Sequence, residues 1–247
     1  HGKRLIGWDE ILEGELPQAA TVMSWRGIEG GIDAARKGHD VVMSPSGDLY
    51  LDYLQTASAD EPPGRPAMIP LEQVYAFEPV PKALDAQQAR HILGVQANVW
   101  TEHMRSYARV QHAVFPRIAA LAETAWSPSS ARDYRGFLQR LPAMLPRWQA
   151  QGIAHAQTPF QPLPTLTTAA NGDALVALSQ PLGYELRYTT DGSAPTATSP
   201  RYFAPLQLPL PTTFSAQAFF DGQPLAAPLL QRLDATALRS RSDEQLA

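Results

Sequence analysis

Short apolar runs alternate with helical stretches through the first 160 residues of the chain. Four runs have the length and composition of buried strands. They lie at residues 3–8, 20–25, 39–44 and 91–95. A helical stretch at residues 28–37 ends at Gly38, a residue typical of a helix C-terminus. Strands that alternate with helices predict parallel β/α units whose helices cover the sheet.

Two longer helices are predicted after the fourth strand. Residues 107–126 place apolar side chains three and four residues apart, which forms one apolar helix face. Pro116 interrupts this stretch and predicts a kink or a new helix start. Residues 131–151 repeat the spacing around two prolines. We assign Trp126 and Trp148, which lie in these helices, to packing.

Residues 45–90, between the third and fourth predicted strands, read as a long loop. The loop contains Tyr50-Leu51-Asp52 and a proline-rich stretch at 61–66. Four strands in about 160 residues are too few for a closed (β/α)8 barrel, which needs about 250 residues. The pattern therefore leaves two α/β architectures open: a small open sheet, or half of a barrel.

The character of the sequence changes near Thr158. Prolines at 159, 162 and 164 are typical of a linker. Four stretches rich in β-formers follow and are predicted as strands; they are residues 174–179, 185–189, 213–220 and 228–233. We predict a first domain at 1–157, a small antiparallel β-sandwich at 158–234, and a polar tail at 235–247.

Composition excludes several classes of protein. A net charge of −4, from 20 basic and 24 acidic residues, shows no bias toward nucleic acid. No apolar run approaches the roughly 18 residues of a membrane span. The absence of Cys removes disulfides and thiolate zinc sites. Because the chain starts at His1 without Met or a signal-peptide pattern, we interpret it as a piece of a longer protein.

Three tryptophans end different predicted strands: Trp8, Trp25 and Trp100. In parallel β/α folds, ligands bind at the carboxyl ends of the strands. Trp100 and Glu102 lie two residues apart, so on an extended backbone they point to the same side. An indole beside an acceptor suits a sugar, which has an apolar ring face and a hydroxyl edge. The alternative is a core Trp beside a solvated Glu.

Further polar residues fall at the same predicted edge. Tyr50 and Asp52 can both face a ligand, as a donor and an acceptor, or can belong to a surface loop. Asp9-Glu10 is similar to a paired-carboxylate site, but neighbours on an extended strand face opposite ways. Glu10 can instead be an acid at a helix start.

Other catalytic and metal-binding classes lack their motifs. The six His residues show no His-Glu-x-x-His spacing, and no Gly-x-Ser-x-Gly elbow is present. The glycines near Gly27 do not form a dinucleotide or phosphate-binding loop. We therefore expect no metal and no cofactor.

Five motifs, in this order and spacing, resemble the β-N-acetylhexosaminidases of glycoside hydrolase family 20. They are Gly7-Trp8-Asp9-Glu10, Ser24-Trp25-Arg26-Gly27, Tyr50-Leu51-Asp52, Gln96 to Glu102, and Pro116-Arg117 leading to Ala122 to Ser127. Residues 165–233 are similar to the β-sandwich that follows the barrel in chitobiase-type members. The resemblance covers most of the chain.

The resemblance implies that the first region supplies strands five to eight of a (β/α)8 barrel. It implies that tryptophans matching Trp8, Trp25 and Trp100 surround the N-acetyl group of a terminal GlcNAc or GalNAc. The tyrosine matching Tyr50 would bond the acetamido oxygen, and Asp52 and Glu102 would accept bonds from outer hydroxyls. The partner implied is an N-acetylhexosamine glycan or chitooligosaccharide, and the family resemblance suggests a periplasmic or secreted protein.

Family catalysis is substrate-assisted: the 2-acetamido oxygen attacks the anomeric carbon. The assisting Asp and the acid/base Glu lie in a His-x-Gly-Gly-Asp-Glu motif on strand four, which these 247 residues do not contain. Asp9-Glu10 matches strand five instead, so no catalytic residue is assigned. We expect the chain alone to be inactive and to pair with the missing half of the barrel or to self-associate. The alternatives are a non-catalytic amino-sugar-binding or vestigial half-barrel protein, and a structural module centred on the sandwich.

Overall fold

The computed structural model describes residues 2–236, which form two compact units. Unit 1 comprises residues 2–55 and 62–156, and unit 2 comprises residues 56–61 and 157–236. The predicted tail at 235–247 lies outside the described residues from 237 onward. Among the helices of residues 2–236, none has the length and apolar character needed to cross a membrane.

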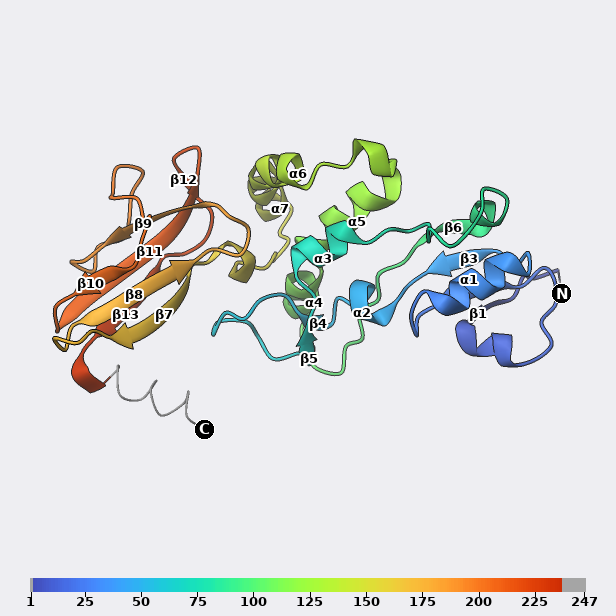
Figure 1. The fold of residues 1–247 in the computed structure, drawn as a ribbon, viewed down its shortest axis with the longest axis horizontal. Helices are drawn as coiled ribbons and strands as arrows, with labels where there is room; N and C mark the ends of the chain where they lie inside the picture. Colours follow the sequence, from blue (N-terminus) through green and yellow to red (C-terminus); the bar gives the residue numbers. More distant parts are fainter. Residues whose placement is uncertain (1, 237–247) are drawn as a thin grey trace. The chain divides into compact units, whose positions relative to one another are not determined.

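A four-stranded parallel sheet forms one part of unit 1 (Figure 1). Its strands are β1 (Ile6–Trp8), β2 (Thr21–Ser24), β3 (Val41–Met43) and β6 (Ile92–Val95). They lie side by side in that order, so each strand pairs in parallel with the next one along the chain. The four strands predicted from the apolar runs are therefore present, although each is shorter than its run.

Helix α1 (Glu29–Arg36) packs on β2 and β3 (Figure 1). The approach is close: a Cβ on Gly31 would lie 2.6 Å from the Met43 sulfur. The helix gives way to Gly38, whose φ of 81° is the left-handed conformation that favours glycine. This confirms the predicted helix and its stop.

Residues 45–90 are not the long loop that the pattern predicted. They form α2 (Ser46–Leu49), a parallel pair β4 (Tyr53–Leu54) and β5 (Arg65–Met68), α3 (Leu71–Ala76) and the 3-10 helix η2 (Gln88–His91). Elements of two to six residues are too short to show a hydrophobic period, which explains why the prediction was wrong.

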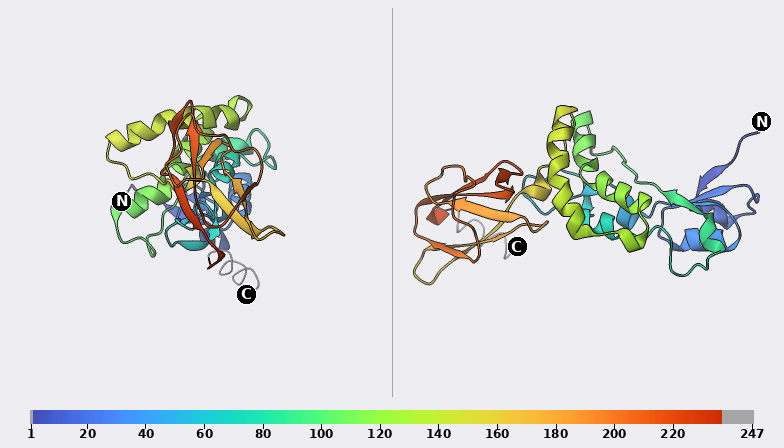
Figure 2. Two further views of the ribbon diagram at one scale, coloured as in Figure 1. Left: turned by 90° about the vertical axis from the view of Figure 1, so that its left-hand side faces the viewer. Right: turned by 90° about the horizontal axis from the view of Figure 1, so that it is seen from above.

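The helical region that follows β6 consists of several separate pieces (Figure 2). Helix α4 (Tyr107–Val114) ends before Pro116, and α5 (Arg117–Trp126) starts after it, which confirms the predicted interruption. The stretch 131–151 becomes three pieces: α6 (Tyr134–Arg140), η4 (Leu141–Met144) and α7 (Leu145–Ala150). The 3-10 helix η3 (Ser129–Ala131) ends at the first residue of that stretch. Prolines cannot donate the backbone hydrogen bonds that one continuous helix needs.

The two helical tryptophans differ. Trp148 is buried, with its ring centroid 5.0 Å from that of Phe115, as a packing residue should be. Trp126 is 90% exposed, so its assignment to packing is wrong within this structure. A helical period shows which face is apolar, but it does not show whether another element covers that face.

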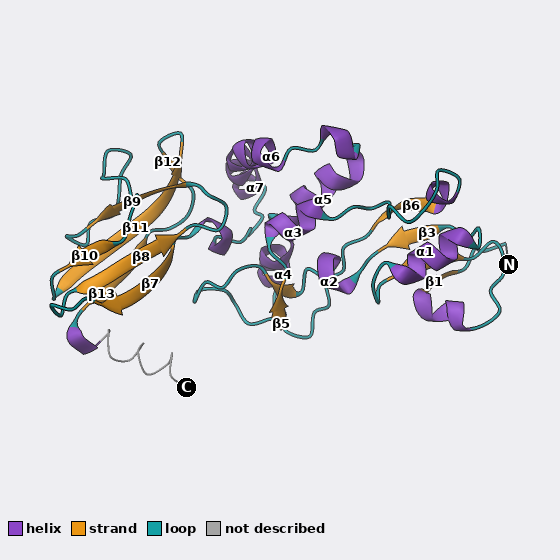
Figure 3. Cartoon of the chain, viewed as in Figure 1, coloured by secondary structure: helices purple, strands orange, loops and turns teal. Residues whose placement is uncertain are grey.

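Unit 2 consists mainly of antiparallel strands (Figure 3). One sheet contains β7 (Leu163–Thr168), β8 (Ala174–Ser179) and β10 (Leu206–Leu208). In the other, β9 (Glu185–Thr189), β12 (Gln223–Pro224) and β13 (Leu229–Leu233) all pair with β11 (Thr212–Phe220). Four of these seven strands were predicted at nearly the observed bounds.

The proline-rich linker predicted near Thr158 is instead ordered structure. Phe160, in the 3-10 helix η5 (Thr158–Phe160), is fully buried. Pro164 lies inside β7, which is an edge strand paired only with β8. Edge strands tolerate proline because one side of their backbone makes no ladder bonds, and the composition therefore misled the prediction.

Candidate functional site

Two of the predicted site tryptophans stand at the carboxyl ends of neighbouring parallel strands. Trp8 is the last residue of β1, and Trp25 directly follows β2. Both rings are half-buried, so each keeps part of its surface open to solvent. The sheet register therefore puts two indoles on one edge of the sheet.

A single parallel bridge beyond the sheet, between Tyr50 and Asn98, brings Tyr50 and Trp100 to the same edge. Strand β6 ends at Val95, so Trp100 and Glu102 lie in the loop after it and not on an extended strand as predicted. Asn98 restores the pairing: its N–H donates to the Leu49 carbonyl at 2.9 Å, and its carbonyl accepts from the Leu51 N–H at 2.8 Å. This pairing sets the segment around Tyr50 beside the segment that carries Trp100.

Four aromatic rings form a continuous cluster there. The centroids of Trp8 and Trp100 are 6.2 Å apart, and those of Tyr50 and Trp100 are 6.3 Å apart. Trp25 stacks on Tyr50 at 6.4 Å with an interplanar angle of 21°. Tyr50 is buried, whereas Trp100 is 41% exposed. An open indole surface backed by packed rings is suited to contact with an apolar group or a sugar ring face.

Burial raises the pKa of the Tyr50 phenol above its ordinary value. The phenol therefore stays protonated at physiological pH and can act as a hydrogen-bond donor.

The two carboxylates at the rim share one arginine. Arg65 Nε lies 3.0 Å from Asp52 Oδ2, and Arg65 Nη2 lies 3.9 Å from Glu102 Oε1. The Asp52 side chain is 1% exposed and that of Glu102 is 59% exposed. Burial raises the pKa of Asp52, and the Arg65 charge opposes that shift. The guanidinium also sits over the Tyr53 ring, 5.6 Å from its centroid.

Arg65 is a site residue that the sequence did not reveal. It belongs to β5 and lies in the proline-rich stretch 61–66, whose composition predicts a loop. Its position depends on the pairing of β4 with β5, which is too short to leave a pattern in the sequence.

Asp9 and Glu10 contact the segment that follows β2. They begin the 3-10 helix η1 (Asp9–Glu13), so they do not alternate across a strand, and the alternative of an acid at a helix start is correct for Glu10. Asp9 is buried and accepts from the N–H groups of Trp25 at 3.0 Å and Arg26 at 3.2 Å, and from Arg26 Nε at 2.7 Å. Glu10 accepts from Trp25 Nε1, which lies 3.0 Å from each carboxylate oxygen.

Arg117, the arginine of the Pro116-Arg117 motif, holds the backbone of the segment that carries Asp52. Its side chain is fully buried at the start of α5. Its guanidinium donates to the carbonyls of Leu51 and, at 3.0 Å, of Tyr53, the two residues that flank Asp52. It also donates to the Ile69 carbonyl at 2.9 Å. One buried cation therefore fixes the backbone on both sides of the rim carboxylate.

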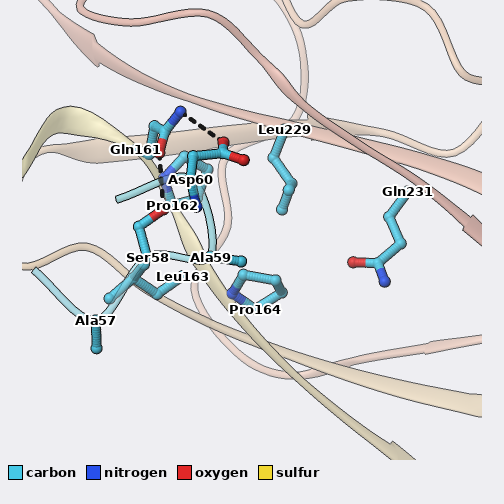
Figure 4. Close-up of a pocket in the computed structure, with 10 residues that line it drawn as sticks. All are labelled: Ala57, Ser58, Ala59, Asp60, Gln161, Pro162, Leu163, Pro164, Leu229 and Gln231. Carbon is cyan, nitrogen blue, oxygen red and sulfur yellow. Dashed lines mark hydrogen bonds between the residues drawn. The ribbon is translucent and has the colours of Figure 1, made fainter. Parts of the chain in front are cut away.

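Unit 2 contains a hollow of about 510 Å³ (Figure 4). Some of its polar lining groups already bond to one another: Gln161 donates to Asp60 at 3.0 Å and accepts from Ser58 at 2.9 Å. No aromatic side chain lines it. Among residues 2–236, no group of three or more His, Asp or Glu side chains is placed to hold a metal ion. The aromatic cluster of unit 1 is therefore the stronger candidate site.

Comparison with known families decides the family of the chain. Residues 1–129 match the model of the glycosyl hydrolase family 20 catalytic domain. The chain belongs to glycosyl hydrolase family 20. Residues 166–227 match a second model, the chitobiase/beta-hexosaminidase C-terminal domain. The whole candidate cluster lies within the segment that matches the family 20 catalytic domain.

Relatives of the chain include a beta-hexosaminidase of Porphyromonas gingivalis, 45% identical over 210 residues, which are 84% of this chain and 27% of the relative. A Vibrio harveyi family 20 exo beta-N-acetylglucosaminidase, solved in complex with N-acetylglucosamine, is 33% identical with a TM-score of 0.58, covering 62% of this chain and 25% of that one. A Streptomyces plicatus N-acetyl-beta-hexosaminidase is 29% identical with a TM-score of 0.56, covering 63% and 32%. The chain thus spans about a quarter of the length of the first two relatives.

Proposed function

We propose that this chain supplies the sugar-binding side of an exo-β-N-acetylhexosaminidase that removes terminal N-acetylhexosamine residues. One observation carries the proposal: Trp8, Trp25, Tyr50 and Trp100 form one cluster at the carboxyl edge of a parallel sheet, with carboxylates at its rim. In the proposed pocket the indoles enclose the acetamido methyl group and the Tyr50 phenol donates to the acetamido oxygen. Asp52 and Glu102 accept from the outer hydroxyls.

The same proposal assigns β1, β2, β3 and β6 to strands five to eight of a (β/α)8 barrel. Two features of the sheet support it. Sequential parallel order is the order of a barrel, whereas a doubly wound sheet reverses direction at a switch point. Both edge strands carry exposed apolar residues, Ile6 at 58% and Leu93 at 60%. In this assignment residues 1–157 are the barrel portion and 158–234 the β-sandwich.

An exposed apolar sheet edge favours association. We therefore expect the isolated 247-residue chain to self-associate, or to bind a separately produced polypeptide carrying the first four strands of the barrel. Light scattering at several concentrations measures the mass. A monodisperse monomer that does not bind the added polypeptide would contradict the half-barrel assignment.

The direct test compares binding with hydrolysis. The full protein that carries these residues should bind N-acetylglucosamine, detected by tryptophan fluorescence, and should not bind glucose, which lacks the acetamido group. Tyr50→Phe should weaken binding about tenfold, since one hydrogen bond to the sugar is lost. Tyr188→Phe in unit 2 is the matched control and should leave binding unchanged. Equal binding of glucose, or no effect of Tyr50→Phe, would refute the proposed pocket.

Hydrolysis separates the proposed enzyme from a non-catalytic sugar-binding protein. The full protein should release the chromogenic group of a β-GlcNAc substrate. The 247-residue chain alone should not, because the Asp-Glu pair that the resemblance requires is absent from its sequence. Release by the isolated chain would refute that expectation, and sugar binding without hydrolysis by the full protein would favour the binding protein.

A further inference from the structure

We propose that Glu10 is a positioning residue that holds the Trp25 indole in the orientation the sugar pocket needs. The inference deepens the proposed function and rests on it. The proposal gives Glu10 no contact with the sugar or with the scissile bond. Its carboxylate acts on the pocket through the Trp25 ring.

Two consecutive carboxylates hold the two ends of Trp25. Asp9 accepts from the Trp25 backbone N–H at 3.0 Å, and Glu10 accepts from the indole Nε1–H, 3.0 Å from both of its oxygens. The 3-10 turn of η1 makes this possible, since a turn of three residues directs neighbouring side chains about 120° apart rather than to opposite faces. The backbone and the ring of one residue are thus fixed from a single short element.

The anchored ring is the one that stacks on Tyr50, with an interplanar angle of 21°. A half-buried indole without a partner for its N–H can rotate to reach water, because the N–H is a donor that needs an acceptor. Rotation would remove the flat wall from beside Tyr50. The Glu10 bond is charge-assisted and prevents that rotation.

The neighbouring charges leave Glu10 free for this role. Arg26 is bonded to Asp9 through Nε at 2.7 Å and to Glu13 through Nη1 at 2.8 Å. Arg26 therefore directs its guanidinium bonds to Asp9 and Glu13 and not to Glu10. The indole bond lowers the pKa of Glu10, so the carboxylate is ionised at neutral pH. A general acid needs a pKa near the working pH, and Glu10 has the opposite property.

The test uses the full protein that carries these residues and reads the Trp25 indole by ¹H–¹⁵N NMR, with the signal assigned through Trp25→Phe. In the unaltered protein the indole signal should titrate in acid as Glu10 takes up a proton. Glu10→Ala should move the signal upfield and abolish that titration. Glu13→Ala is the matched control and should leave the signal in place, because Glu13 lies on the same turn and bonds to Arg26 rather than to the indole.

Sugar affinity supplies the second readout. Glu10→Ala should weaken N-acetylglucosamine binding about three- to tenfold, the range of one charge-assisted bond discounted for solvent exposure. Glu10→Gln keeps an acceptor oxygen and should restore affinity to within about twofold. The inference is overturned if Glu10→Ala leaves the indole signal in place, or if the signal moves and the affinity for N-acetylglucosamine does not change. If the unaltered protein binds no sugar, the proposed function fails, and the indole titration still decides whether Glu10 sets the ring.

Discussion

Arg117→Met is expected to lower the free energy of unfolding of unit 1 by at least about 3 kcal/mol. The guanidinium is fully buried and donates to carbonyls from three separate segments, at Ala113, Ile69 and the pair Leu51 and Tyr53. Met fills much of the same volume but donates to none of them. Each buried carbonyl left without a partner costs about 1–3 kcal/mol, which is why the expected loss is large.

Urea denaturation followed by circular dichroism measures this loss. Arg147→Met is the matched control, because Arg147 is an exposed residue of α7 and its replacement should change stability by no more than about 0.5 kcal/mol. Sugar binding should fall with Arg117→Met even under conditions where the protein stays folded, since the backbone on both sides of Asp52 loses its anchor. Equal stability of the two variants would show that Arg117 does not hold this part of the fold.

The sequence predicts the parts of the site that follow long apolar runs. Trp8 and Trp25 were placed at strand ends because β1 and β2 are apolar runs with polar residues directly after them. Parallel strands bring such ends to one edge, and the structure does so. The spacing of Tyr50 and Asp52 makes them candidates but leaves a surface loop open, and the motif resemblance gives each a role.

Contacts that depend on very short strand pairings cannot be predicted from the sequence. Trp100 reaches the cluster through the Asn98 bridge beyond β6, and Arg65 reaches Asp52 through the β4–β5 pair. Both pairings involve very few residues, and their register comes from tertiary packing rather than from local sequence preference. The sequence does not reveal the role of Glu10 for a related reason: Asp9 and Glu10 lie on a 3-10 turn, where neighbouring side chains do not point to opposite faces as they would on a strand.

Arg65→Met is expected to move the acid limit of sugar binding to higher pH. Asp52 accepts a stronger bond from a sugar hydroxyl when it is ionised than when it is protonated. Burial raises its pKa and the neighbouring Glu102 carboxylate raises it further, while Arg65, 3.0 Å away, lowers it. Binding is therefore retained above the Asp52 pKa and lost as pH falls through it. Removing the cation raises that pKa, so the loss begins at a higher pH.

The pH profile of N-acetylglucosamine affinity distinguishes this charge effect from simple loss of packing. Arg65→Lys keeps the charge and should shift the profile less than Arg65→Met, whereas Asp52→Asn should flatten the acid limb and weaken binding about 10- to 100-fold. Burial raises the pKa of the Tyr50 phenol, so this neighbour does not titrate in the acid range. If Arg65→Met lowers affinity equally at every pH, the arginine acts by shape and not by holding Asp52 ionised. A shifted limb that disappears with Asp52→Asn would assign the titration to the buried carboxylate.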